Sequence, residues 1–214
     1  MSLLEMLHGR YVHDRRTSVL SEWCSNLVLR NARVLDVGSG DGRLAQLVAN
    51  KRPDISIIGI DVQSSPNAAI PIKTFNGKSI PYGDGSFDVV MLIDVLHHTV
   101  EPMILLREAV RVAQQVVLIK DHLLQGAFAY STLRLMDWVA NARHGIALPY
   151  NYWTPAQWHG AFDKLRLTAS SWESNLKLYP FPADMIFGRD LHFIAVLRVP
   201  AQKKNSDREL LAPN

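Results

Sequence analysis

Residues 34–45 read VLDVGSGDGRLA, and this stretch decides the fold of the chain. A short apolar run, Arg33–Val37, leads into glycines at positions 38, 40 and 42, and helix-forming residues follow from Arg43 to Ala49. Glycines at the end of a strand permit a tight turn, and they let a ligand approach the backbone at the start of the next helix. The stretch therefore predicts a strand, a ligand-binding turn and a helix.

Strand-sized apolar runs alternate with helical segments through the rest of the chain. Near-continuous apolar strands of this kind are typical of a parallel sheet that is covered on both faces. We therefore predict a doubly wound α/β fold with a mostly parallel, seven-stranded sheet and an antiparallel closing strand. Strands are expected at Ile55–Ile60, Ile72–Phe75, Phe87–Ile93 and Gln115–Lys120, helices at His13–Leu29, Met103–Val112 and from Thr154 to about Leu165, and a closing antiparallel pair at Arg166–Trp172 and Leu191–Val199.

Two connections differ from the ordinary pattern. Only ten residues separate Asp61 from Ile72, and they include two prolines, so a full crossover helix hardly fits there. The segment 122–153 is instead too long for a simple connection, and long insertions in compact domains are usually functional. We expect this segment to form a helical cap insertion followed by a loop.

The composition indicates a folded globular protein. The chain has 214 residues, of which 48% are hydrophobic and 20% are charged. We expect one domain over residues 1–200, with a helical segment at 1–30, and a flexible tail at 201–214. The single cysteine, Cys24, excludes an internal disulfide and a four-cysteine zinc site, and it suits a reducing compartment. A cytoplasmic location is therefore expected.

The sequence does not favour a nucleic acid or a membrane as a partner. The net charge is +3, and the basic residues are spread out, whereas nucleic-acid binding normally needs a dense basic face. Apolar stretches such as Phe193–Leu197 are far too short to span a bilayer, and the N-terminus lacks the pattern of a secretory signal. The sequence predicts no oligomeric state.

The glycine turn and the next strand together predict the ligand. Asp61 closes that strand 21 residues after Gly40, where a carboxylate can accept both hydroxyl hydrogens of a ribose. A dinucleotide pattern would place a third glycine at position 43, which is Arg43, so a dehydrogenase is disfavoured. Asp36 supplies a carboxylate for an ammonium group. A nucleoside that bears an amino acid, namely S-adenosylmethionine, is the expected cofactor.

The same motifs resemble a known family. VLDVGSGDGRLA (34–45) resembles the first motif of class I S-adenosylmethionine-dependent methyltransferases, and IGIDV (58–62) resembles their acidic second motif. IPYGDGSFDVVMLIDVLHH (80–98) is similar to a segment of the ubiquinone/menaquinone-biosynthesis-like, type 11 subgroup. With REAVRV and VVLIKDH, the resemblance covers residues 33 to about 122. It implies a Rossmann-like fold and transfer of a methyl group to a small-molecule acceptor.

The resemblance also implies which residues contact the cofactor. An acidic residue usually receives the adenine amino group in this family, whereas Asn76 stands at that position; an amide oxygen can accept the same hydrogen bond without the charge. The expected cofactor contacts are Asp36, Gly38, Gly40, Asp61, Val62, Asn76, Gly77, Asp94 and His98.

Candidates for catalysis and acceptor binding follow from their place in the predicted fold. His97 and His98 follow the fourth strand and His122 follows the fifth, so each is a candidate general base, although each could instead pack or fix a loop. Polar residues spaced along one face of the cap helix, and two tyrosines after it, are candidates for binding the acceptor. These residues are Arg134, Asp137, Asn141, His144, Tyr150 and Tyr152.

The role of the cap residues and the function of the chain each leave an alternative open. The tyrosines either wall a substrate pocket or cover the core, and a polar helix face is often only solvated.

The remaining histidines show no metal-ligand spacing, so no metal site is expected. Methyl transfer depends chiefly on alignment and desolvation, and it therefore leaves few catalytic signatures in a sequence. A non-catalytic or partner-dependent methyltransferase-like binding protein is the alternative function.

Overall fold

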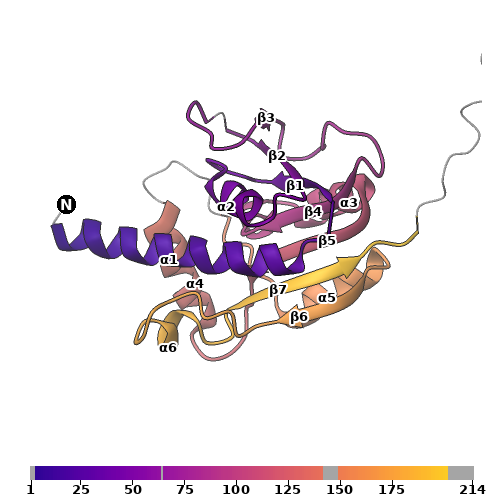
Figure 1. Cartoon of the computed structure of the whole chain (residues 1–214). Helices are drawn as coiled ribbons and strands as arrows, with labels where there is room; N and C mark the ends of the chain where they lie inside the picture. Colours follow the sequence, from indigo (N-terminus) through magenta and orange to yellow (C-terminus); the bar gives the residue numbers. More distant parts are fainter. Residues whose placement is uncertain (1–2, 64, 142–148, 202–214) are drawn as a thin grey trace, which may run out of the picture.

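A single seven-stranded sheet organises the computed structural model (Figure 1). Residues 3–63, 65–141 and 149–201 are described, and for 3–13, 140 and 141 the backbone alone is described. The strand order is β3-β2-β1-β4-β5-β7-β6, and β7 runs antiparallel to the other six strands. The strands are β1 Arg33–Val37, β2 Ser56–Asp61, β3 Ile72–Thr74, β4 Phe87–Ile93, β5 Ala113–His122, β6 Thr168–Glu173 and β7 His192–Arg198.

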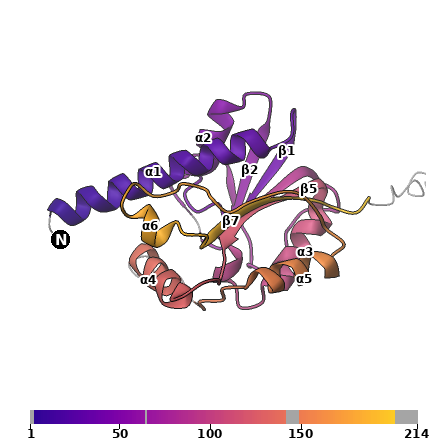
Figure 2. The same ribbon diagram turned by 90° about the horizontal axis from the view of Figure 1, so that it is seen from below.

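Helices cover both faces of the sheet, as the apolar strands predict. Figure 2 shows α1 and α2 over one face and α3 and α5 over the other. Along β1, Val34 packs into the core under α1 and α2, whereas Leu35 and Val37 pack into the core under α3 and α5. The helices are α1 Leu3–Leu27, α2 Arg43–Lys51, α3 Pro102–Val112, α4 Ala129–Asn141, α5 Pro155–Lys164 and α6 Asp184–Phe187, with a 3₁₀ turn, η1, at Leu96–His98.

The topology fixes where a ligand can bind. The strand order reverses between β1 and β4, and open α/β sheets bind ligands at the carboxyl ends of their strands beside such a reversal. The glycine turn and η1 follow these two strands directly. The cap helix α4 follows β5, and it contacts α6 just before β7. Candidate functional residues therefore converge on this edge of the sheet.

The structure corrects some expected boundaries. The helix α1 begins at Leu3, ten residues before the expected start at His13. The strand β5 extends to His122, so this histidine ends the strand rather than following it. No helix connects β2 and β3 in the described part of that segment, which agrees with its short length. None of the helices in the described ranges is both long and apolar enough to cross a membrane.

Candidate functional site

The glycine turn has the backbone that its sequence predicts. Gly38, Gly40 and Gly42 all have positive φ angles, of 73°, 57° and 75°, which side chains other than glycine rarely adopt. The Gly40 amide donates a hydrogen bond of 2.8 Å to Asp61 Oδ2. A Cβ atom added at Gly40 would meet no atom within 4 Å, so the turn opens onto free space at this point. The turn can therefore take a ligand against its backbone.

Asp36 is a buried carboxyl group near the end of β1, the strand that leads into the glycine turn. Its exposed fraction is 3%, and no hydrogen-bond donor among the described residues reaches its side chain. Burial, together with the nearby charge of Asp61, raises the pKa of Asp36 to about 7. A buried carboxyl without a partner favours a cationic ligand, since a positive charge would stabilise its ionised form. This environment fits the ammonium group of the expected cofactor.

The residues expected around the adenine lie together, but one detail is corrected. Val62 is 59% exposed, and its side chain is the one that a Cβ atom at Gly77 would touch. The Asn76 side-chain oxygen already accepts two backbone hydrogen bonds, from Lys78 at 2.9 Å and Ser79 at 2.8 Å. Both lone pairs are thus used within the turn, so this oxygen is not free to accept the adenine amino group.

Asp94 belongs to an ion network that the sequence did not reveal. Its two oxygens lie 2.5 Å from Arg16 Nη2 and 2.5 Å from Lys120 Nζ, and Lys120 is fully buried. Lys120 also lies 3.3 Å from Nδ1 of His192. Burial would raise the pKa of Asp94, but the charges of Arg16 and Lys120 hold it well below its usual value. Asp94 therefore links α1, β4 and β5 at the carboxyl ends of the strands. It was expected to line the site of the methyl donor there.

A second buried network surrounds His97. Its Nδ1 atom lies 2.6 Å from Asp121 Oδ1 and 3.2 Å from Nδ1 of His122. Asp121 also accepts backbone hydrogen bonds from Leu96 at 3.0 Å and from His122 at 2.7 Å. Burial would lower the pKa of His97, but Asp121 and Asp137 offset it, and the pKa is raised. His97 is thus a buried imidazole whose protonated form is stabilised by two carboxylates.

The other two candidate bases are uncharged at neutral pH. Burial, followed by the positive charge of His97, lowers the pKa of His98 to about 4 and also lowers the pKa of His122. His98 is partly exposed, and its Nδ1 atom is buried with no hydrogen-bond partner among the described residues. His122 is 3% exposed. His98 is therefore the neutral imidazole that is most open to a ligand.

The side chains around His97 also approach one another closely enough to hold a metal ion. The two groups with this spacing in the described ranges are Asp94, His97 and His122, and His97, His98 and Asp137. Two cations already pair with the Asp94 carboxylate, and Asp121 already pairs with His97, so each group has competing partners. The sequence-based expectation of no metal stays a prediction.

Asp137 and Arg134, which were predicted to share one polar face of the cap helix, differ in burial. Asp137 is only 5% exposed, and its Oδ2 atom accepts a 2.5 Å hydrogen bond from the Tyr152 hydroxyl group, which is also buried. Leu135, Trp138 and Val139 occupy the exposed side of α4. The Nε2 atom of His97 lies 3.7 Å from Asp137, so the buried carboxylate has an imidazole beside it as well.

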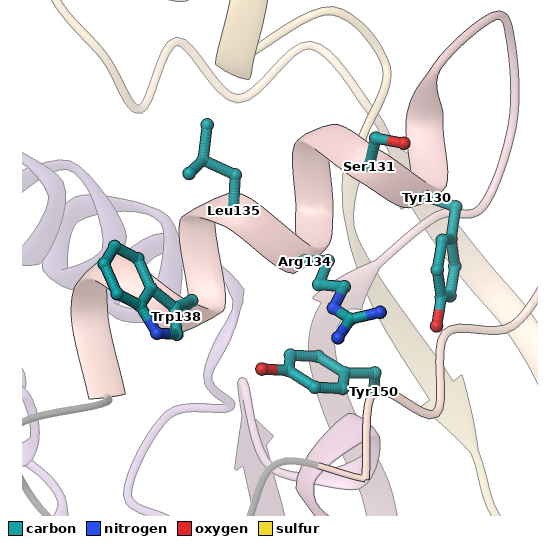
Figure 3. Close-up of a pocket in the computed structure, with 6 residues that line it drawn as sticks. All are labelled: Tyr130, Ser131, Arg134, Leu135, Trp138 and Tyr150. Carbon is teal, nitrogen blue, oxygen red and sulfur yellow. The ribbon is translucent and has the colours of Figure 1, made fainter.

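The four other cap candidates have different outcomes. Arg134 is exposed, and its guanidinium lies 4.9 Å from the ring centre of half-buried Tyr150. Figure 3 shows both side chains along one groove. His144 lies outside the described residues, and so does the side chain of Asn141.

Several site residues were missed by sequence reasoning. Asp121 and Lys120 stand beside His122 in the sequence, and a charged triplet at the end of an apolar strand was the available signal. Arg16 carried no such signal, because it lies 78 residues from Asp94. Asn151 also contributes, since its amide donates to the Thr99 carbonyl at 3.2 Å and anchors the end of the cap near His97.

Comparisons with known proteins identify the central part of the chain. Residues 35–117 match the model of a methyltransferase domain. A curated relative, the 27-O-demethylrifamycin SV methyltransferase of Amycolatopsis mediterranei, is 27% identical in an alignment 136 residues long that covers 51% of this chain and 50% of the relative. The chain thus spans half the length of that curated relative.

Solved structures show the same fold at low sequence identity. A chain of the complex between the Haloferax volcanii Trm112 methyltransferase activator and a methyltransferase is 15% identical, with a TM-score of 0.65, covering 90% of this chain and 93% of that one. A SAM-dependent methyltransferase from Aquifex aeolicus is also 15% identical, with a TM-score of 0.60, covering 85% and 89% of the two chains.

Proposed function

We propose that this chain, whose residues 35–117 match a methyltransferase domain, is a class I S-adenosylmethionine-dependent methyltransferase of the type 11 kind and that it methylates a small-molecule acceptor held under the cap helix α4. The cofactor supplies an electrophilic methyl group. The glycine turn, Asp36 and Asp61 would hold it, since they combine open backbone, a partnerless buried carboxyl and a ribose-binding carboxylate. A cytoplasmic site of action is part of this proposal, because the single cysteine, Cys24, is buried and free.

The acceptor would lie between η1 and the cap. The cap returns to η1 through Asn151, whose backbone amide donates to the His97 carbonyl at 3.3 Å. Tyr152 and Asp137 form a buried hydrogen bond beside His97, which closes this edge to water. Exclusion of water and fixed alignment are the main demands of methyl transfer, so a closed, well-anchored cap supports this activity.

His98 is the residue best suited to accept a proton from the acceptor. The observation that carries this assignment is its buried, partnerless Nδ1 atom, together with a pKa lowered to about 4, which keeps the ring unprotonated at neutral pH. His97 and His122 would fix the surroundings instead, because His97 is held by Asp121 and His122 is almost fully buried. A general base contributes roughly 10²–10⁴-fold to a rate, and most when its pKa lies near the working pH, so a ring whose pKa is lowered to about 4 is expected at the lower end of that range.

The experiment has two stages. Calorimetry with S-adenosylhomocysteine tests cofactor binding, and a panel of hydroxyl and amine acceptors then tests methyl transfer. For an accepted substrate, His98→Gln should lower kcat about 100-fold while the affinity for S-adenosylhomocysteine stays within about twofold. His159→Gln, on the exposed side of α5, is the matched control and should leave kcat unchanged. An unchanged kcat in His98→Gln would exclude the proposed base.

A partner-dependent or non-catalytic role is the second candidate function. Exposed apolar side chains gather on two contacting helices, α4 and α6, and such a patch often marks a protein interface. The Haloferax structural neighbour is likewise part of a complex with a methyltransferase activator. Cofactor binding without turnover on any acceptor would favour this candidate. The exposed side chains are Leu135, Trp138, Val139, Met185 and Ile186.

A further inference from the structure

The outer side of α4 carries a groove with an unusual combination of side chains. Its volume is about 350 Å³, within the range of small-molecule sites. Figure 3 shows three aromatic rings and one guanidinium along it. Tyr130 is 47% exposed and Trp138 is 58% exposed, so their rings remain open to a ligand. The lining residues are Tyr130, Ser131, Arg134, Leu135, Trp138 and Tyr150.

Arg134 gives the groove its charge. No carboxylate of the described residues forms an ion pair with Arg134, whose guanidinium lies 4.9 Å from the Tyr150 ring centre. A guanidinium is planar, stacks on aromatic rings and pairs with carboxylates through two parallel hydrogen bonds. A ligand with an aromatic ring and an anionic group would therefore satisfy both the rings and the cation. An aliphatic or a neutral ligand would satisfy only one of them.

The groove adjoins the residues proposed for methyl transfer. The Tyr152 ring centre lies 6.0 Å from that of Tyr130 and 6.3 Å from that of Tyr150, both of which line the groove. On its other side, Tyr152 lies 6.0 Å from the His97 ring and 5.6 Å from the His122 ring. One buried tyrosine thus separates the groove from the histidine network.

We propose that the groove is a second binding site and that its ligand is a planar aromatic anion, such as an aromatic carboxylate. Arg134 pairs with the anionic group, and Tyr130, Trp138 and Tyr150 line the groove for the aromatic ring. The inference goes beyond the proposed function, because the groove lies on the outer side of α4 whereas the proposed acceptor lies under this helix. The binding step itself needs neither the cofactor nor turnover, so it can be measured independently.

Three probes of similar size separate the contributions of ring and charge. Calorimetry would compare 2-naphthoate, which has both, with 2-naphthamide, which lacks the charge, and decahydro-2-naphthoate, which lacks the aromatic ring. The proposal expects 2-naphthoate to bind about tenfold more tightly than either of the others, a difference that corresponds to about 1.4 kcal/mol. Equal affinity for 2-naphthoate and decahydro-2-naphthoate would refute the aromatic part of the proposal.

Variants test whether the binding occurs in this groove. Arg134→Met keeps the apolar stem and should reduce 2-naphthoate affinity to that of 2-naphthamide, whereas Trp138→Leu should weaken both aromatic probes. Arg107→Met, at an exposed position on α3, is the matched control and should bind like the native protein. Unchanged affinity in Arg134→Met would overturn the proposal.

Discussion

Asp121 Oδ1 lies 2.6 Å from Nδ1 of His97, and neither side chain is more than 2% exposed. Asp121 cannot reach a substrate from this position, but it fixes the imidazole ring and its charge. Because the two residues are 24 positions apart, this contact also joins the end of β5 to the turn after β4. The relationship makes Asp121 a positioning residue for the histidine network.

Asp121→Asn should lower the His97 pKa toward or below its usual value, because burial would then act with less opposition. In the native protein the raised pKa contributes stability that is present below about pH 6.5 and is lost as the pH rises through the folded-state pKa. The variant should lose this pH dependence. Breaking a buried pair should also cost about 3–5 kcal/mol. NMR titration of the imidazole and unfolding at several pH values would measure both effects.

Asp163→Asn, an exposed substitution of the same kind on α5, should change neither quantity. An imidazole titration that is identical in Asp121→Asn and the native protein would contradict the assigned role of Asp121.

The affinity for S-adenosylhomocysteine should rise with pH up to about 7 and then level. Below pH 7 the Asp36 carboxyl is largely protonated, because burial and the nearby Asp61 raise its pKa to about 7, and a neutral carboxyl attracts an ammonium group weakly. The affinity can change by at most about tenfold per pH unit, because one proton is involved. Asp36→Asn should remove this dependence and weaken binding at pH 8. Calorimetry between pH 5.5 and 8 would measure it, with Asp41→Asn, in the same turn, as the control.

Gly40→Ala should weaken cofactor binding more than its effect on stability explains. A matched control exists in Gly126→Ala, since both glycines have positive φ angles and an added Cβ atom would meet nothing within 4 Å at either. Both variants should lose about 1–2 kcal/mol of stability from backbone strain. Only Gly40 lies in the proposed cofactor turn. Equal affinities for S-adenosylhomocysteine in the two variants would place the cofactor elsewhere.

Tyr152→Phe should loosen the cap, because it removes the 2.5 Å hydrogen bond to the buried Asp137 carboxylate. Hydrogen bonds to charged groups contribute roughly 1.5–3 kcal/mol. We expect a stability loss of that size and faster amide exchange in α4. Tyr150→Phe is the control, since no described residue hydrogen-bonds to that hydroxyl group, and it should have little effect on either measurement. Equal losses in the two variants would exclude the Asp137 contact as the cause.

Local patterns in the sequence determined the architecture and the cofactor side of the candidate site. The strand Phe87–Ile93 has the predicted bounds, because a continuous apolar run can only be a buried strand in this alternating pattern. The glycines of the turn and Asp61 also lie where the spacing places them, since backbone freedom and strand ends are local properties. The backbone of the proposed cofactor turn was therefore predictable within one strand–turn–helix–strand unit.

The acceptor side was decided only by tertiary structure. A helical pattern shows which residues share a face, but the neighbours of that face determine which polar groups are buried. Asp137 lies inside beside His97 and the Tyr152 hydroxyl group, and Asp94 is paired because α1 brings Arg16 to it from 78 residues away. Such charges are buried only as partners, and partners that are distant in sequence leave no periodic signal, so the folded chain alone brings them together.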